Sequence, residues 1–366
     1  MSLARELWQA GVDAVGGEAA VQRALETGHI VKPDQILAVG KAAGAMTKAA
    51  RAVFPDVPAL VVTKDGHGDD LPADVTLIEA AHPVPDARSL AGGKALQDAV
   101  DALPGHATLL LLVSGGASSL AENLRPGKTL EDLATLNRHL LASGMDITKM
   151  NAERRKISAL KGGGLLSGFK GATVEVLAIS DVPGDDIAVI GSGIGAAPEP
   201  YPFAYTCRIV ASNAHARAAT AALANQKGLP VHLNEQGLHD DLDALVERWR
   251  LILRDMPPGV AILGGEPTVR LPKSPGRGGR NQALALALAR EIAGQDGIEI
   301  VVGGTDGSDG PTDAAGGIVT GATWTAEGAD ALTRADSGTY LAARDALLET
   351  GPTGTNVMDL LIAVKS

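Results

Sequence analysis

Small and polar residues follow six predicted strands, each at the point where an apolar run ends. The strands are predicted at 36–39, 109–113, 174–179, 208–211, 260–263 and 299–302. The residues that follow them are Gly40-Lys41, Ser114-Gly115-Gly116-Ala117-Ser118, Ser180-Asp181, Ser212-Asn213, Gly264-Gly265-Glu266 and Gly303-Gly304-Thr305-Asp306. In open parallel sheets, ligands bind outside the carboxyl ends of the strands. We therefore expect one ligand-binding edge in each domain, or a cleft that the domains share.

The composition of these segments indicates phosphate binding. Small residues let backbone N–H groups approach an anion, and a following helix adds the positive end of its dipole. Ser114-Gly115-Gly116 fits this description, as does the segment 276–281, which contains Gly279, Arg280 and Asn281. A single glycine-rich loop can be only a tight turn. Several such loops in one chain favour phosphate binding.

Two basic residues stand at the starts of predicted helices. Lys41 directly follows a strand, and Arg280 begins the helix predicted at 280–292. A cation at a helix N-terminus opposes the helix dipole. A solvated side chain explains such a position, and so does a group that meets an anion. Phosphoryl transfer needs cations around the migrating group, and Lys41 and Arg280 can supply them.

The same reaction needs a divalent metal, which carboxylates would hold together with phosphate oxygens and water. Mg²⁺ is the expected ion, and its candidate ligands are Asp181, Glu266 and Asp306, with Asp185, Asp186 and Asp309 as further candidates. Each of these residues is equally well explained alone as a turn residue or a helix cap.

Several other classes of protein lack support. The chain has no Walker-type phosphate-binding loop, no complete dinucleotide-binding fingerprint and no histidine pair at metal-ligand spacing. Its net charge of −11, from 43 acidic and 32 basic residues, argues against a nucleic-acid partner. We see no signal peptide and no apolar run of about 18 residues, so no membrane span is expected. Cys207 is the single cysteine, and a reducing cytoplasm is the expected compartment.

Short apolar runs alternate with amphipathic stretches along the 366 residues, which predicts an α/β protein with a largely parallel sheet. Further strands are expected at 60–63, 76–80 and 357–364, and helices at 41–53, 89–103, 130–143, 214–226, 240–254 and 280–292. The length suits two domains. Glycine and proline residues between 228 and 258 suggest a break there, and we place the domains at 1–235 and 236–366.

Seven segments, taken together and in order, resemble the class II glycerate 2-kinases, enzymes with a C-terminal MOFRL domain. They are Gly40-Lys41-Ala42-Ala43, His82-Pro83-Val84-Pro85-Asp86, Ser114-Gly115-Gly116, Ser180-Asp181-Val182-Pro183-Gly184-Asp185, Gly278-Gly279-Arg280-Asn281-Gln282, Gly304-Thr305-Asp306-Gly307-Ser308-Asp309-Gly310 and Gly351-Pro352-Thr353-Gly354-Thr355-Asn356-Val357. The resemblance runs over nearly the whole chain.

The resemblance implies ATP-dependent phosphorylation of D-glycerate to 2-phosphoglycerate with a divalent metal. It implies a Rossmann-like domain, a smaller α/β domain and an active site in the cleft between them. The family's functional lysine and arginine correspond to Lys41 and Arg280. The expected partners are the small molecules D-glycerate and ATP, and the sequence leaves a homodimer open.

The chain departs from the family at three places. Gly164 stands where the family has arginine, Ala117 where it has glycine, and Met358 where it has a polar residue. These differences bear on substrate preference more than on reaction class. The alternative is a hydroxypyruvate reductase using NAD(P)H, a name that members of this family have carried.

Overall fold

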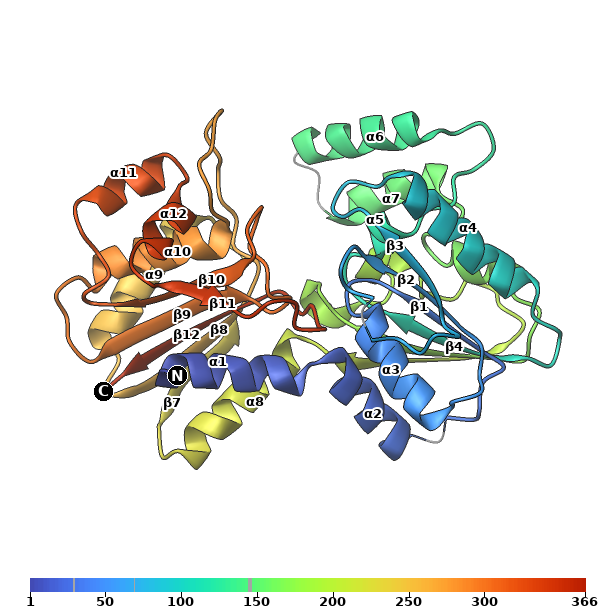
Figure 1. Cartoon of the computed structure of the whole chain (residues 1–366), viewed down its shortest axis with the longest axis horizontal. Coiled ribbons are helices and arrows are strands. Elements are labelled where there is room, and N and C mark those ends of the chain that lie inside the picture. Colours follow the sequence, from blue (N-terminus) through green and yellow to red (C-terminus); the bar gives the residue numbers. More distant parts are fainter. Residues whose placement is uncertain (29, 69, 144–146) are drawn as a thin grey trace. The chain divides into compact units, whose positions relative to one another are not determined.

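The computed structural model describes residues 1–28, 30–68, 70–143 and 147–366, and it divides into two compact units (Figure 1). The N-terminal unit comprises residues 16–212 with 354–356, and the C-terminal unit comprises residues 1–15, 213–353 and 357–366. The boundary predicted between residues 235 and 236 falls inside a strand, β7 (Val231–Gln236), whereas the units divide between residues 212 and 213.

The N-terminal unit is built on six parallel strands. They are β1 (Gln35–Val39), β2 (Ala59–Lys64), β3 (Thr76–Ala80), β4 (Thr108–Val113), β5 (Thr173–Ile179) and β6 (Ala204–Ala211). Their order in the sheet is β3-β2-β1-β4-β5-β6, and every neighbouring pair is parallel. The predicted parallel α/β sheet is thereby confirmed. All six strands were expected, with bounds that differ by a few residues at most.

Helices cover both faces of this sheet, as unbroken apolar strands require. Leu37 and Val39 pack in a core with Leu96 and Val100 of α4 (Ala87–Asp101). The alternate residues of β1 are equally buried, and α2 (Gly17–Thr27) and α3 (Ala43–Val53) pack against the sheet. The remaining helices of the unit are α5 (Ala117–Leu120), α6 (Leu130–Ser143), α7 (Ile147–Ile157) and the 3-10 helices η1 (Gly164–Gly168), η2 (Pro183–Asp185) and η3 (Ile190–Gly193).

The chain reverses its direction across the sheet between β1 and β4. From β1 it proceeds outward to β2 and β3, and it then returns to β4 on the other side of β1. Such a switch point opens a crevice at the carboxyl ends of the two central strands. Lys41 follows β1 and Ser114 follows β4, so the topology brings their loops together at this crevice.

The C-terminal unit contains a second sheet, which is mixed rather than largely parallel. Its strands are β7, β8 (Gly259–Gly265), β9 (Ile298–Gly304), β10 (Ala314–Thr320), β11 (Leu347–Glu349) and β12 (Asp359–Lys365). Their order is β11-β10-β9-β12-β8-β7, and β7–β8 is the parallel pair while the other four pairs are antiparallel. The second domain was expected to be a smaller α/β domain, and the largely parallel sheet is that of the N-terminal unit. The sheet of the C-terminal unit is mixed because β10 runs antiparallel to β9, and β12 runs antiparallel to both β8 and β9.

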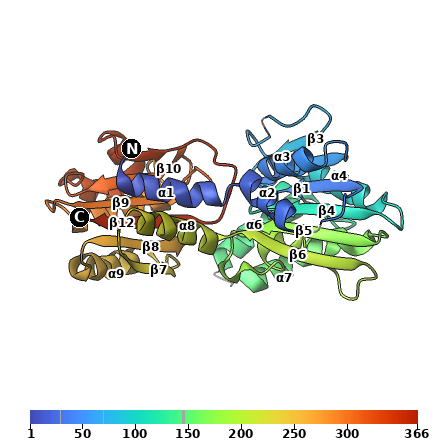
Figure 2. The same ribbon diagram turned by 90° about the horizontal axis from the view of Figure 1, so that it is seen from below.

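Helices also cover the second sheet. In Figure 2, α1 (Leu3–Ala14) and α8 (Asn213–Gln226) lie side by side, and both pack against β12. A separate core joins the sheet to α9 (Leu242–Asp255), α10 (Arg280–Glu291), α11 (Glu327–Thr333) and α12 (Ser337–Ala342). Within the described residues, no helix has both the length and the apolar character needed to cross a membrane.

Candidate active site

Lys41 is held at the switch point by backbone contacts between the loops after β1 and β4. Its N–H group donates to the carbonyl oxygen of Gly115 at 2.9 Å, and the N–H group of Ala42 donates to Ser114 Oγ at 3.0 Å. Ser114 is fully buried, so this hydroxyl serves the loop rather than the solvent. The helix α3 begins two residues later, at Ala43, and Lys41 therefore stands in the loop before it.

The backbone of Gly116 borders the side chains of Lys41 and His82. Gly116 has φ +83°, and a Cβ atom there would lie 3.1 Å from Lys41 Cγ and 3.3 Å from the His82 ring. Glycine is therefore favoured here for two reasons. The backbone is left-handed, and there is little space for a side chain. The absent side chain leaves this space to the side chains of Lys41 and His82.

Asp181 approaches the same loop from the end of β5. A Cβ atom at Gly115 would collide with the Asp181 carboxylate and with the side-chain amide of Asn356. Asn356 Nδ2 in turn donates to Asp181 Oδ2 at 3.4 Å. The N-terminal unit thus brings together the predicted residues Lys41, Gly115, Gly116 and Asp181.

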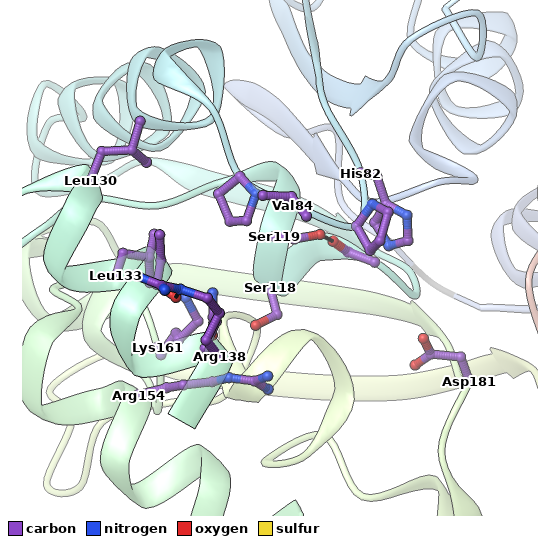
Figure 3. A pocket seen from close by; sticks show the side chains of 15 residues that line it. His82, Val84, Ser118, Ser119, Leu130, Leu133, Arg138, Arg154, Lys161 and Asp181 are labelled. Atoms are coloured by element: carbon purple, nitrogen blue, oxygen red, sulfur yellow. Dashed lines mark hydrogen bonds between the residues drawn. The ribbon is translucent and has the colours of Figure 1, made fainter. Parts of the chain in front are cut away.

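A cavity of about 520 Å³ opens beside this cluster (Figure 3). Its walls include Gly116, Ser118, His82 and Asp181, with apolar side chains from the segment 83–85 and from α6. Of the predicted loop residues, Ser118 faces the cavity, whereas Ala117 packs its methyl group in the hydrophobic core.

Arg280 is anchored by two carboxylates in the C-terminal unit. Its Nε donates to Asp359 Oδ2 at 2.7 Å and its Nη2 to Asp359 Oδ1 at 3.3 Å, while Nη1 lies 2.6 Å from Glu266 Oε1. Burial raises the pKa of Asp359, and Arg280 opposes that shift. Burial alone would lower the pKa of Arg280, but Asp359 and Glu266 together raise it above its usual range. Arg280 therefore stays a cation in a fixed position.

The start of α10 is capped by a carboxylate rather than left open. Asp309 accepts from the N–H groups of Asn281 at 3.1 Å and Gln282 at 2.8 Å. A Cβ atom at Gly279 would collide with this carboxylate, so the glycine permits the cap. Burial raises the pKa of Asp309 to about 7, although the two N–H groups oppose the shift. The predicted residues Gly279 and Asn281 are thus engaged with Asp309.

Asn213 holds elements of the C-terminal unit together. It is buried at the start of α8, and its Nδ2 donates to the carbonyl oxygens of Val357 at 3.0 Å and Asp359 at 3.1 Å. Its Oδ1 accepts from Arg217 Nε at 3.0 Å. These contacts join the start of α8 to the start of β12.

The three candidate metal ligands lie in different surroundings. Asp181 borders Gly115, Glu266 pairs with Arg280, and Asp306 Oδ1 accepts from the N–H and hydroxyl of Ser308, both at 3.0 Å. Across residues 1–28, 30–68, 70–143 and 147–366, no three His, Cys, Asp or Glu side chains form a metal-binding group. Single carboxylates of this kind suit Mg²⁺, which takes most of its ligands from phosphates and water.

Sequence reasoning missed three residues of this arrangement. Asn356 lies three residues before β12 and Asp359 is the first residue of β12, and both make contacts with distant parts of the chain. Arg154 lies on α7 in a run of charged residues that has the pattern of a solvated helix face. Only Asn356 carried a signal, because it belongs to the conspicuous polar segment 351–357, whereas Asp359 lies inside the predicted strand 357–364.

The departure at Gly164 follows from close packing in this chain. A Cβ atom at Gly164 would collide with the carbonyl oxygen of Ala159. An arginine at this position would thus require the backbone to move. The departure at Met358 leaves a buried side chain, and the backbone carbonyl oxygen of Met358 accepts from the Thr305 hydroxyl at 2.7 Å.

Comparison with known proteins agrees with this architecture. Residues 3–225 match the family model described as a domain of unknown function, DUF4147, and residues 259–359 match the MOFRL family. A D-glycerate 2-kinase from Thermotoga maritima is 35% identical, with 99% of this chain and 97% of the relative covered. The crystal structure of a glycerate kinase from the same organism superposes with a TM-score of 0.87 at 33% identity, covering 100% of this chain and 99% of that one.

A relative from Agrobacterium vitis carries a hydroxypyruvate reductase name. It is 37% identical, with 89% of this chain and 97% of the relative covered. The matched family models and the kinases among the relatives define the class of this protein as a kinase. The chain belongs to the glycerate kinase family.

Proposed function

We propose that this protein transfers the γ-phosphoryl group of ATP to D-glycerate and releases 2-phosphoglycerate. The observation that carries the proposal is the position of Lys41, whose side chain borders Gly116 at the switch point of the parallel sheet. A cation beside a glycine-rich loop is the arrangement that stabilises a transferring phosphoryl group. The names of the relatives support the same reaction.

In this reaction the 2-hydroxyl oxygen of glycerate forms a bond to the γ-phosphorus. The bond between that phosphorus and the bridging oxygen of ADP breaks, and the hydroxyl proton is released. Lys41 orients the substrate and the phosphate, and the backbone at Gly115 and Gly116 binds an anion. The N–H group of Ser114, which was also predicted to do so, already donates to the carbonyl oxygen of Val39 at 2.9 Å. Arg280 neutralises charge on the transferred group. Its side chain is 34% exposed, and Asp359 and Glu266 hold its guanidinium in place.

Mg²⁺ would be held by phosphate oxygens together with a carboxylate. Asp181 is the favoured ligand, because its carboxylate borders Gly115 at the switch point, and Asp306 and Glu266 are the other proposed ligands. When bound, the ion would neutralise phosphate charge. We place the reaction in the cytoplasm, which supplies ATP and keeps a thiol such as Cys207 reduced.

Two parallel assays on the purified protein test this function. ADP release is measured with D-glycerate and MgATP, and NADH absorbance is measured with hydroxypyruvate. We expect ADP release that depends on glycerate, with no oxidation of NADH. Oxidation of NADH without ADP release would instead support the reductase, although the dinucleotide-binding fingerprint is missing from the first strand and its loop.

A further inference from the structure

The cavity of the N-terminal unit is lined by three long basic side chains among the described residues: Arg138, Arg154 and Lys161. Two of the three have an evident structural explanation. Lys161 forms an ion pair with Glu122, and both side chains are almost fully buried. Arg138 is exposed on α6 and bonds to its own helix, with Nη2 donating to Thr135 Oγ1 at 3.1 Å. Neither residue needs a ligand to explain its position.

Arg154 is different because it has no carboxylate partner within ion-pair distance in the described part of the chain. Its Nη1 donates to the amide oxygen of Asn151 at 3.4 Å. The side chain is half-buried, and burial lowers the pKa of Arg154 while the nearby Glu122 charge raises it. A guanidinium that has lost part of its water is normally paired with an anion.

A chain of hydrogen bonds links Arg154 to the predicted phosphate loop. Ser118 Oγ lies 2.8 Å from Ser192 Oγ, and Ser192 Oγ donates to Asn151 Oδ1 at 3.0 Å. The same Asn151 oxygen accepts from Arg154. Figure 3 shows the Ser118 hydroxyl and the Arg154 guanidinium pointing toward one another in the cavity.

We propose that Arg154 and Ser118 form a subsite for an oxyanion of the substrates. The geometry combines a guanidinium without a carboxylate partner, a hydroxyl and a cavity wall that both of them face. The Ser118 hydroxyl donates to Ser192 Oγ, because Ser192 Oγ donates to Asn151, and it would turn to the ligand when the subsite is filled. This inference rests on the proposed kinase function, which supplies two such oxyanions, the carboxylate of glycerate and a phosphate of the nucleotide. Asn151 and Ser192 are positioning residues that fix the two donors.

Equilibrium binding to the full chain tests the subsite and identifies its ligand. Calorimetry measures D-glycerate and the non-hydrolysable ATP analogue AMP-PNP with the wild-type protein and with Arg154→Met. Loss of a hydrogen bond to a charged group should weaken one ligand by roughly 10- to 100-fold. Weakened glycerate binding assigns the carboxylate, and weakened AMP-PNP binding assigns a phosphate. Unchanged affinity for both ligands overturns the proposal.

Arg155→Met is the matched control, because Arg155 is the next residue on α7, is exposed and does not line this cavity. It should bind both ligands as the wild type does, and an equal loss in this variant would overturn the assignment to Arg154. If Arg154→Met does not fold, Ser118→Ala provides the same test, since it removes one hydroxyl. Unchanged affinities in Ser118→Ala would then overturn the proposal.

The binding experiment does not depend on catalysis. The kinase function and the Arg154 subsite can therefore be tested independently of each other. A wild-type protein that binds both ligands but forms no phosphoglycerate would contradict the kinase function, and the Arg154 variants would still decide the subsite. A wild-type protein that binds neither ligand would overturn both proposals.

Discussion

Arg280 and Asp359 form a two-point ion pair, with 2.7 Å between Nε and Oδ2 and 3.3 Å between Nη2 and Oδ1. The Asp359 side chain is 3% exposed, whereas that of Glu266, the second partner of Arg280, is 50% exposed. Because the Asp359 carboxylate has lost its water, the positive charge of Arg280 is needed to stabilise its negative charge. Glu266 keeps much of its hydration, and its pairing with Arg280 should contribute less to stability.

Replacement of the two carboxylates should therefore have unequal effects on folding. Asp359→Asn leaves Arg280 without its buried partner, and we expect a loss of about 3 kcal/mol in the free energy of unfolding. Glu266→Gln should cost less than about 1 kcal/mol. Urea denaturation followed by circular dichroism measures both. Equal losses of unfolding free energy in the two variants would show that the burial of Asp359 does not make its pairing with Arg280 more important for stability than that of Glu266.

The activity and stability of the protein should depend on glycine at position 116, in the loop after β4. Gly116→Ala places a methyl group against Lys41 and His82, so we expect ADP release to fall at least about tenfold, because a small displacement of catalytic groups is costly. The left-handed backbone should add a loss of about 1 kcal/mol in stability.

Gly127 is the matched control for this experiment. It has φ +81°, close to the +83° of Gly116, but a Cβ atom there would have nothing within 4 Å. Gly127→Ala should lose a similar amount of stability and keep its activity. An equal loss of activity in both variants would mean that backbone strain, rather than contact with Lys41, explains the effect.

Asp309 should make stability depend on pH. Its pKa is about 7 in the folded protein and about 3.9 in the unfolded chain. Between these values the folded state holds a proton that the unfolded state has lost, so stability falls as the pH rises through 7. The Asp359 and Arg280 charges, which face Asp309, shift its pKa in opposite directions.

Asp309→Asn removes the titrating carboxyl group, so comparison with the wild type gives the contribution of Asp309 to the pH dependence of stability. The stability of the wild type relative to Asp309→Asn should fall by on the order of 2 kcal/mol between pH 5 and pH 8. Urea unfolding of both proteins at several pH values measures this difference. A difference that stays constant with pH would show that Asp309 does not titrate in this range.

The sequence predicted which loops meet at the switch point of the N-terminal unit, because this information is local. Lys41 and Ser114 each follow an apolar strand, and parallel strands bring such ends to one edge of a sheet. No long-range contact had to be known to place them there. Ser118 was found by the same reasoning, since it belongs to the loop after β4.

The other features of the fold and the site depend on contacts between residues that lie far apart in the sequence. Asn356 bonds to Asp181 across 175 residues, and no local pattern predicts this pairing. Residues 1–15 join the C-terminal unit because α1 packs on β9 and β12. The strand β10 contains Gly316 and Gly317, which are poor strand formers that obscured its pattern.

The most direct test of the account is product formation by variants of its two cations. Phosphorus NMR follows D-glycerate and MgATP with the wild type, Lys41→Met and Arg280→Met, after circular dichroism has shown that each variant is folded. We predict 2-phosphoglycerate from the wild type and at least a roughly thousandfold slower reaction in each variant, the scale on which single electrostatic groups act in catalysis. Undiminished formation of 2-phosphoglycerate by either folded variant would contradict the account.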